Sequence, residues 1–164
     1  MPASTTSSTL PTELRAHLEA SRRALLDAIA GLDEEGFHAR TRSSQWSPAE
    51  VLAHLLASER LYMGWAQAAL EEDNLVLQPV AQDEQEQQAK LAQQMAVPQI
   101  LHGLLAQRRD TMQLLMTLSS EQLTRTLSYP GRGSFGLGLL VEKAAAHEEE
   151  HAAQIRSLRG AGAP

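Results

Sequence analysis

The sequence predicts an all-α fold, a four-helix bundle with a long connection between its second and third helices. Apolar residues recur at spacings of three and four along four separate stretches. Aromatic residues make up only 4% of the 164 residues, so the core must consist of aliphatic residues that favour helices. No stretch carries a clear strand pattern. We expect a disordered leader over residues 1–10 and a single domain over residues 11–160.

The first helix is expected to begin at Pro11 and to end at Gly31, because proline suits a first turn and glycine a helix end. A polar connection over residues 33–45 should follow it. The residues on the predicted inner face recur at helical spacing: Leu14, Leu18, Arg22, Leu25, Ile29 and Leu32.

The start of the second helix, in the run WSPAEV, is the most strongly marked feature of the chain. Ser47 can cap the helix, Pro48 suits its first position, and Glu50 can close a capping box with Ser47. Trp46 and Val51 stand where a hydrophobic staple would place them. The helix should reach about Glu72, with one face formed by Val51, Leu55, Tyr62, Ala66 and Ala69.

Two more helices are expected after a polar connection over residues 73–96. The third helix opens near Pro98, and the last follows a loop over residues 119–135, with Ser134 as its cap. The long connection allows the second and third helices to run in other than a simple up-and-down order. The predicted inner faces consist of Ile100, Leu104, Met112, Leu115 and Leu118, and of Leu137, Leu140, Val141, Ala144, Ile155 and Leu158.

Composition excludes several classes of function. A net charge of −6 without a basic stripe argues against nucleic-acid binding. The absence of cysteine excludes disulfides, thiolate metal sites and a cysteine nucleophile. The first ten residues have neither the positive charge nor the apolar run of a secretory signal, and no stretch is apolar enough to span a bilayer. We therefore expect a cytoplasmic protein that does not interact with membranes.

The last predicted helix contains two histidines four residues apart, in the run AAAHEEEHAAQI. This spacing places His147 and His151 on one face, toward the apolar side of the helix. Imidazoles facing a core are costly unless their nitrogens are used, and neutral imidazole is a strong ligand for divalent transition ions. A single inward histidine is more often a satisfied core residue, so the pair needs a third ligand to indicate a metal site.

The third ligand is expected from upstream. The run also spells H-E-x-x-H, but Gln154 and Ser157 stand where an extended zinc-protease motif requires Gly and His, so we reject that class. His54, in the second turn of the second helix, is the candidate. Three protein ligands leave coordination positions open, as in catalytic sites. The other histidines are interpreted as surface residues: His17, His38 and His102.

Several other residues were weighed as functional candidates. Arg108 lies on the inner face of the third helix and needs a carboxylate partner, for which Glu59 and Glu150 are candidates. Either acid could also orient a ligand histidine or accept a proton, so these three residues are the weaker catalytic candidates. The G-x-G-x-x-G spelled by residues 131–136 lacks the strand context of a nucleotide-binding loop. Finally, aromatic side chains could shape a pocket beside the second helix: Trp46, Tyr62 and Trp65.

Three stretches together resemble the DinB/YfiT-like family of bacterial four-helix-bundle metalloproteins: WSPAEVLAHLLASERLY, ILHGLLAQRRDTMQLLMTL and PGRGSFGLGLLVEKAAAHEEEHAAQI. The likeness covers nearly the whole chain beyond the leader, and the family's motif histidines fall on His54, His147 and His151. The resemblance implies a bound divalent ion, commonly zinc or nickel, and a homodimer. Some branches are transferases or isomerases that use low-molecular-weight thiols. The glutamine-rich residues 82–94 match no motif of the family.

These observations predict a divalent-metal-dependent enzyme that acts on a small molecule. A bound ion can activate a water or a thiol at neutral pH, so hydrolysis and thiol transfer both fit. Because the chain has no cysteine, any thiol must be a cosubstrate. The alternative is a non-catalytic helical module that dimerises or binds a partner, with a structural metal or none.

Overall fold

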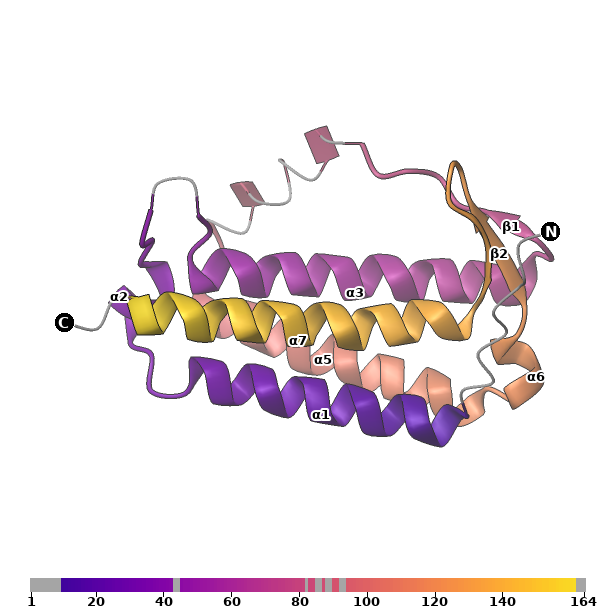
Figure 1. Cartoon of the computed structure of the whole chain (residues 1–164), viewed down its shortest axis with the longest axis horizontal. Coiled ribbons are helices and arrows are strands. Elements are labelled where there is room, and N and C mark those ends of the chain that lie inside the picture. Colours follow the sequence, from indigo (N-terminus) through magenta and orange to yellow (C-terminus); the bar gives the residue numbers. More distant parts are fainter. Residues whose placement is uncertain are drawn as a thin grey trace.

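Four long helices form an elongated bundle in the computed structural model, which describes residues 10–42, 45–81, 83, 84, 87, 90, 91 and 94–161 (Figure 1). The predicted leader, apart from Leu10, and part of the glutamine-rich segment lie outside the described residues. The long helices are α1 (Pro11–Ile29), α3 (Pro48–Glu71), α5 (Val97–Thr117) and α7 (Gly138–Ala161). The predicted all-α bundle is confirmed as the main architecture.

The helices follow an order that short loops alone could not produce. In Figure 1, α1 and α7 run in one direction, and α3 and α5 run in the other. Helix α7 packs against both α1 and α3, and α5 packs against α3 and more lightly against α1. Because α3 and α5 are parallel, the chain must return along the length of the bundle between Glu71 and Val97. The departure from up-and-down order that the long connection allows is therefore found in the structure.

The start of α3 has the local interactions that its sequence predicts. The hydroxyl of Ser47 accepts a hydrogen bond from the backbone N–H of Glu50. The Glu50 carboxylate in turn accepts one from the Ser47 N–H at 2.7 Å, which completes the capping box.

A glycine permits the close approach of α3 and α5. A Cβ on Gly103 of α5 would lie 2.7 Å from Leu56 Cδ2 of α3.

The expectation of a chain without strands was wrong over residues 119–135. This segment forms the short helix α6 (Ser120–Leu123) and the antiparallel strands β2 (Thr126–Tyr129) and β3 (Gly133–Gly136). Strand β1 (Leu75–Val76) adds to β2 in parallel. Left-handed backbone at Gly131 and Gly133, with φ of 78° and 79°, permits the tight turn between β2 and β3. Sequence periodicity over four residues is too short to reveal such strands.

Two helix boundaries also differ from expectation. Ser134 does not cap the last helix: it pairs with Ser128 across the hairpin, and α7 begins four residues later. The predicted polar connection over residues 33–45 contains the short helix α2 (Glu34–His38). Asp33 caps α2, because its carboxylate accepts a hydrogen bond from the Gly36 N–H at 2.8 Å.

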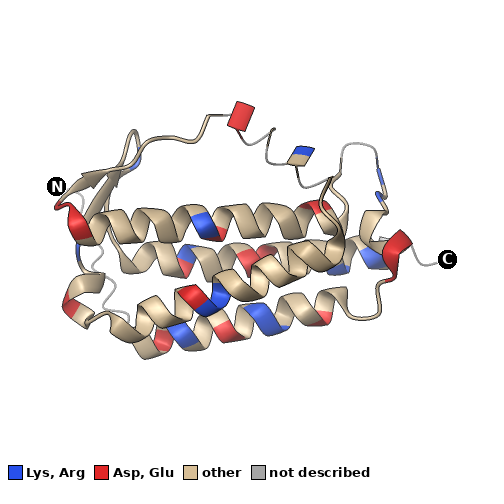
Figure 2. Cartoon of the chain, turned by 180° about the vertical axis from the view of Figure 1, so that it is seen from behind, with Lys and Arg blue, Asp and Glu red and all other residues tan. Residues whose placement is uncertain are grey.

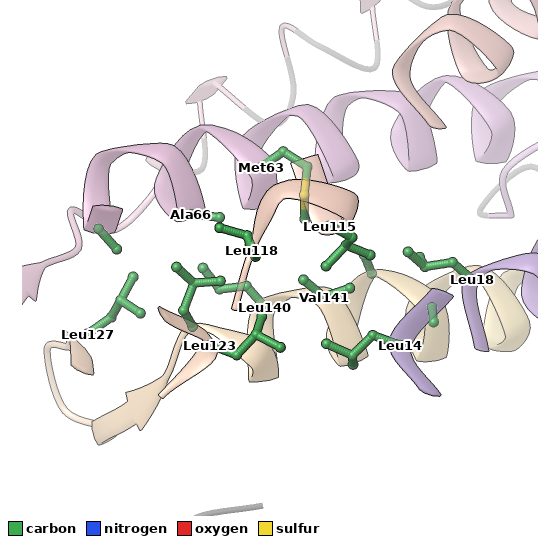
Figure 3. Close-up of a cluster of buried hydrophobic side chains, with 14 of the residues drawn as sticks. Leu14, Leu18, Met63, Ala66, Leu115, Leu118, Leu123, Leu127, Leu140 and Val141 are labelled. Carbon is green, nitrogen blue, oxygen red and sulfur yellow. The ribbon is translucent and has the colours of Figure 1, made fainter. Parts of the chain in front are cut away.

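The apolar interior is divided into two clusters along the bundle. Figure 3 shows the first, near the sheet, where aliphatic side chains from all four long helices meet. Its fully buried members include Leu18 of α1, Met63 of α3, Leu115 of α5 and Val141 of α7. The second cluster lies toward the other end and is formed mainly by Leu25, Ile29, Val51, Leu52, Leu55, Leu56, Ile100, Leu104, Ala152 and Ile155.

A layer of charged side chains separates the two apolar clusters, with one residue from each long helix. We call this layer the charge cluster: Arg22, Glu59, Arg108 and Glu148, which are all at least nine-tenths buried. The Arg108 guanidinium donates to Glu59 at 2.9 and 3.1 Å and to Glu148 at 3.1 Å. The Arg22 guanidinium donates to Glu148 at 3.1 to 3.3 Å. Each carboxylate therefore meets two guanidinium groups, which offsets the cost of burying it.

Candidate metal centre

Helices α3 and α7 bring the three predicted histidines together. His54 lies in the second turn of α3, whose start is fixed by the capping box, and His147 and His151 lie on successive turns of α7. All three side chains are partly buried, at the junction where α7 packs against α3. A single nitrogen from each ring lies within 4.8 Å of the others. Within the described residues, this is the one group of histidines and acids that meets that criterion.

The ring nitrogens that face one another are all Nε2 atoms. His147 Nε2 lies 3.1 Å from His54 Nε2 and 3.0 Å from His151 Nε2. The rings meet edge to face, with centroids 4.5 to 5.1 Å apart. Each ring therefore directs the same atom at a common point rather than stacking on its neighbour.

The side chain of Gln154 determines which nitrogen of His151 is free. His151 Nδ1 lies 2.7 Å from Gln154 Oε1, an amide oxygen that can only accept. Nδ1 therefore carries the proton, and in the neutral ring the lone pair is on Nε2, which faces His147. This is the usual arrangement of a metal-ligating histidine, whose second nitrogen donates to an oxygen acceptor.

Burial and neighbouring charges keep the rings of His54 and His147 neutral. Burial, with the neighbouring imidazoles of His147 and His151, lowers the pKa of His54 from 6.5 to about 4. Burial also lowers the pKa of His147, an effect that His151 reinforces and the Glu150 carboxylate opposes. At neutral pH both rings thus have lone pairs available, the form that a metal ion requires.

The donor set fits a divalent transition ion. Ligands placed about 2.1 Å from a metal at angles of about 90–109° are about 3.0–3.4 Å apart, close to the two observed Nε2 separations. Without a cation, His147 Nε2 has at most one proton to share between two neighbouring nitrogens, and His151 Nε2 has none to offer. At most one of the two short contacts can then be a full hydrogen bond. A cation among the three nitrogens removes this conflict.

Aromatic rings surround the histidine cluster. The ring centroid of Trp46 lies 4.8 Å from that of His54 and 6.5 Å from that of His151. Tyr62 lies on the other side, 6.4 Å from His147. Burial and the nearby Glu150 carboxylate raise the pKa of the Tyr62 phenol, so this group keeps its proton. Of the three aromatic residues expected to shape a pocket beside α3, Trp46 and Tyr62 thus contact the histidine cluster, and Trp65 contacts Tyr62.

The other candidate residues have different surroundings. Arg108 is buried against a carboxylate, as predicted for Glu59, but its second partner is Glu148 and not Glu150. Glu150 is exposed, and its negative charge acts on His147 and Tyr62. His17 pairs with Glu149 at 3.2 Å, and His38 pairs with Glu34 at 3.1 Å. His102 is exposed, so none of these three histidines joins the cluster.

Comparison with known proteins assigns the chain to a family. A profile of the DinB superfamily matches residues 17–155, which include all three clustered histidines. The chain belongs to the DinB superfamily. The resemblance drawn from the sequence motifs is thereby confirmed.

Several known proteins resemble this chain over most of its length. A protein of Oceanobacillus iheyensis named "putative metal-dependent hydrolase" is 28% identical over 136 residues, 83% of this chain and 78% of the relative. YfiT of Bacillus subtilis, described as a probable metal-dependent hydrolase with an unusual four-helix bundle topology, matches 98% of this chain and 93% of its own, with a TM-score of 0.74 and 20% identity. The four-helix bundle protein TT2238 matches 90% and 98%, with a TM-score of 0.65 and 20% identity.

Two α7 residues of this DinB superfamily member were not predicted from the sequence: Gln154, which contacts the site, and Glu148, which belongs to the charge cluster. The apolar residues predicted for the inner side of α7 suggest a buried face whose centre lies near the histidines. In the structure, the centre of the buried face lies at Ala145, Glu148 and Ala152. The histidines lie at the flank of that face, half-buried toward α3. Glu148 and Gln154 carried no distinguishing pattern, because glutamate and glutamine are common on solvated helix surfaces.

Proposed function

We propose that this protein is a divalent-metal-dependent hydrolase that acts on a small molecule, with His54, His147 and His151 as its metal ligands. The observation that supports this proposal is the convergence of three imidazoles, with His147 Nε2 at 3.1 Å from His54 Nε2 and 3.0 Å from His151 Nε2. Zinc and nickel are among the ions that suit an all-imidazole donor set. An ion held here would supply Lewis-acid chemistry, by which a water becomes a nucleophile at neutral pH.

The surrounding residues prepare the site in distinct ways. Gln154 holds the proton of His151 on Nδ1, and the lowered pKa of His54 keeps that ring neutral. Glu150, which is exposed beside His147 and Tyr62, is the residue we propose as proton acceptor. Glu59 and Arg108 take no part in this proposal, because their charged groups are committed to each other and to the rest of the charge cluster.

Both the hydrolase proposal and its alternatives are tested by one set of assays. The full chain is purified, its metal content is measured, and carboxyl-ester, amide and phosphoester substrates are screened with zinc or nickel added. We expect hydrolysis that requires the ion and disappears in His147→Ala. Turnover only in the presence of glutathione or cysteine would instead establish a thiol transferase. A protein that binds metal but turns over nothing with any ion or thiol would support the non-catalytic module.

A further inference from the structure

All the tryptophan and tyrosine residues of the chain lie in one row of contacts that passes through the histidine cluster. We call Trp46, Tyr62, Trp65 and Tyr129 the aromatic row; they are the two tryptophans and two tyrosines of the sequence. Beyond the contacts with histidine, the ring centroid of Tyr62 lies 6.0 Å from that of Trp65. That of Trp65 lies 6.4 Å from that of Tyr129, on strand β2.

The rings of the aromatic row lie at the edge of the core: Tyr62, Trp65 and Tyr129 pack against the first apolar cluster but are only partly buried. The fully buried core consists of aliphatic side chains, whereas each of these four rings keeps part of its surface open to solvent. Trp46 is 37% exposed, and the other three are intermediate. In a chain with so few aromatic residues, four partly exposed rings in series form a surface suited to stacking on a ligand.

A positive charge lies at the end of the row that is farthest from the histidines. The Arg132 guanidinium carbon lies 5.9 Å from the centre of the Tyr129 ring, within the range of a cation–π contact. Arg132 is exposed at the turn between β2 and β3, and among the described residues no carboxylate forms an ion pair with it. A guanidinium held in this way can bind an external carboxylate or phosphate.

We propose that the substrate is an elongated organic anion: its reactive group lies at the histidine cluster, its apolar part packs against Tyr62 and Trp65, whose rings are tilted 49° to each other, and its anionic group binds Arg132. This inference rests on the proposed function, because it assigns the reactive end to the metal centre. Tyr62, Trp65 and Tyr129 follow one another between His147 and Arg132 in contacts of 6.0–6.4 Å, and this succession is the basis for an elongated ligand.

A binding assay with a matched pair of probes tests the proposal. The pair is 4-biphenylacetate and its neutral amide, 4-biphenylacetamide, and acetate alone is a further control. Binding to the full chain is measured by calorimetry. The protein is used both as purified, with known metal content, and after chelation. Chelation removes direct binding of the carboxylate to a metal. In the chelated protein we expect the biphenyl anion to bind about fivefold more tightly than its amide, and acetate not to bind detectably.

Three variants locate the probe on the row. Arg132→Gln should bind the anion no more tightly than the amide, whereas Arg109→Gln, which removes an exposed arginine from α5, should bind both probes as the wild type does. Trp65→Leu should weaken both probes about tenfold. Tyr129→Leu replaces Trp65→Leu if circular dichroism shows that the latter has lost its helices.

The outcome separates this inference from the metal proposal. Equal binding of anion and amide, or an unchanged preference for the anion in Arg132→Gln, would overturn the role of Arg132. Unchanged affinity in the folded ring variant would overturn the stacking surface. Either result leaves the metal content of the same preparation untouched, and a protein without histidine-bound metal could still bind the probes along the row.

Discussion

Two clusters of polar side chains lie inside this bundle, and they differ in whether their members can satisfy one another's hydrogen bonds and charges. In the charge cluster, two guanidinium groups and two carboxylates satisfy one another, with Thr111 and Ser21 as further donors to the carboxylates. In the histidine cluster, three nitrogens of the same kind face one another, and their protons cannot satisfy both short contacts. Neighbouring residues of α7, His147 and Glu148, belong to one cluster each.

This contrast separates a structural polar site from a binding site. A cluster with balanced charges needs nothing from outside, and its removal affects folding. A cluster in which only lone pairs converge needs a cation. Removal of such a cluster affects binding of the cation. The overall charge pattern gives no such distinction, because acidic and basic residues are mixed along the helices (Figure 2). Among the described residues, no helix is both long and apolar enough to cross a bilayer.

The largest effect is expected from His147→Ala on metal binding. Zinc-binding energies of about 10–16 kcal/mol for four-ligand sites correspond to roughly 3 kcal/mol per ligand, so affinity should fall on the order of a hundredfold to a thousandfold. The melting temperature of the metal-free protein should change little, because the ring is only half-buried. Competition titration with a chromophoric chelator measures the affinity. Wild-type metal affinity in this variant would contradict the contrast between the histidine cluster and the charge cluster.

The next residue along α7 should behave in the opposite way. Glu148→Gln leaves Arg22 and Arg108 with too little negative charge, and breaking such a buried pair costs about 3–5 kcal/mol of unfolding free energy. Metal affinity of the folded fraction should be nearly unchanged. Urea denaturation measures the loss, and Glu149→Gln, whose exposed pair with His17 contributes less than about 1 kcal/mol, is the control. Equal stability of the two variants would refute the structural role of the charge cluster.

A smaller effect is expected from Gln154→Ala, which removes the acceptor for the Nδ1 proton of His151. Loss of such a hydrogen bond typically lowers metal affinity about 10–100-fold. Gln154→Glu keeps an acceptor at the same position and should restore affinity to at least the wild-type value. If both variants bind metal equally, the orientation of His151 does not depend on this side chain.

The smallest effect is a pH dependence of stability in the metal-free protein. Burial lowers the pKa of His54 from 6.5 to about 4, so below pH 6.5 the unfolded chain binds a proton that the folded chain does not. The stability contributed by the neutral ring is full above pH 6.5 and is lost as the pH falls toward 4. Melting temperatures over this range should fall less steeply in His54→Gln than in the wild type. Parallel curves would show that the ring is not held neutral by folding.

The sequence predicts the long helices and the three histidines for physical reasons that act locally. Helical periodicity, the capping box at Ser47 and the i, i+4 spacing of His147 and His151 are properties of short segments. Burial of Glu148 could not be predicted, because it depends on arginines from α1 and α5 that lie 126 and 40 residues away. The hairpin was missed for a related reason: strands of four residues gain their stability from pairing, and not from a pattern of their own.

The central claim is that the histidine cluster binds a cation through three Nε2 atoms while the charge cluster binds none. X-ray absorption spectroscopy of the full chain loaded with one equivalent of zinc tests this most directly. The claim predicts three imidazole nitrogens at about 2.0–2.1 Å from the ion, and fewer in His54→Ala. A spectrum with oxygen ligands alone, or one unchanged by that substitution, would contradict it.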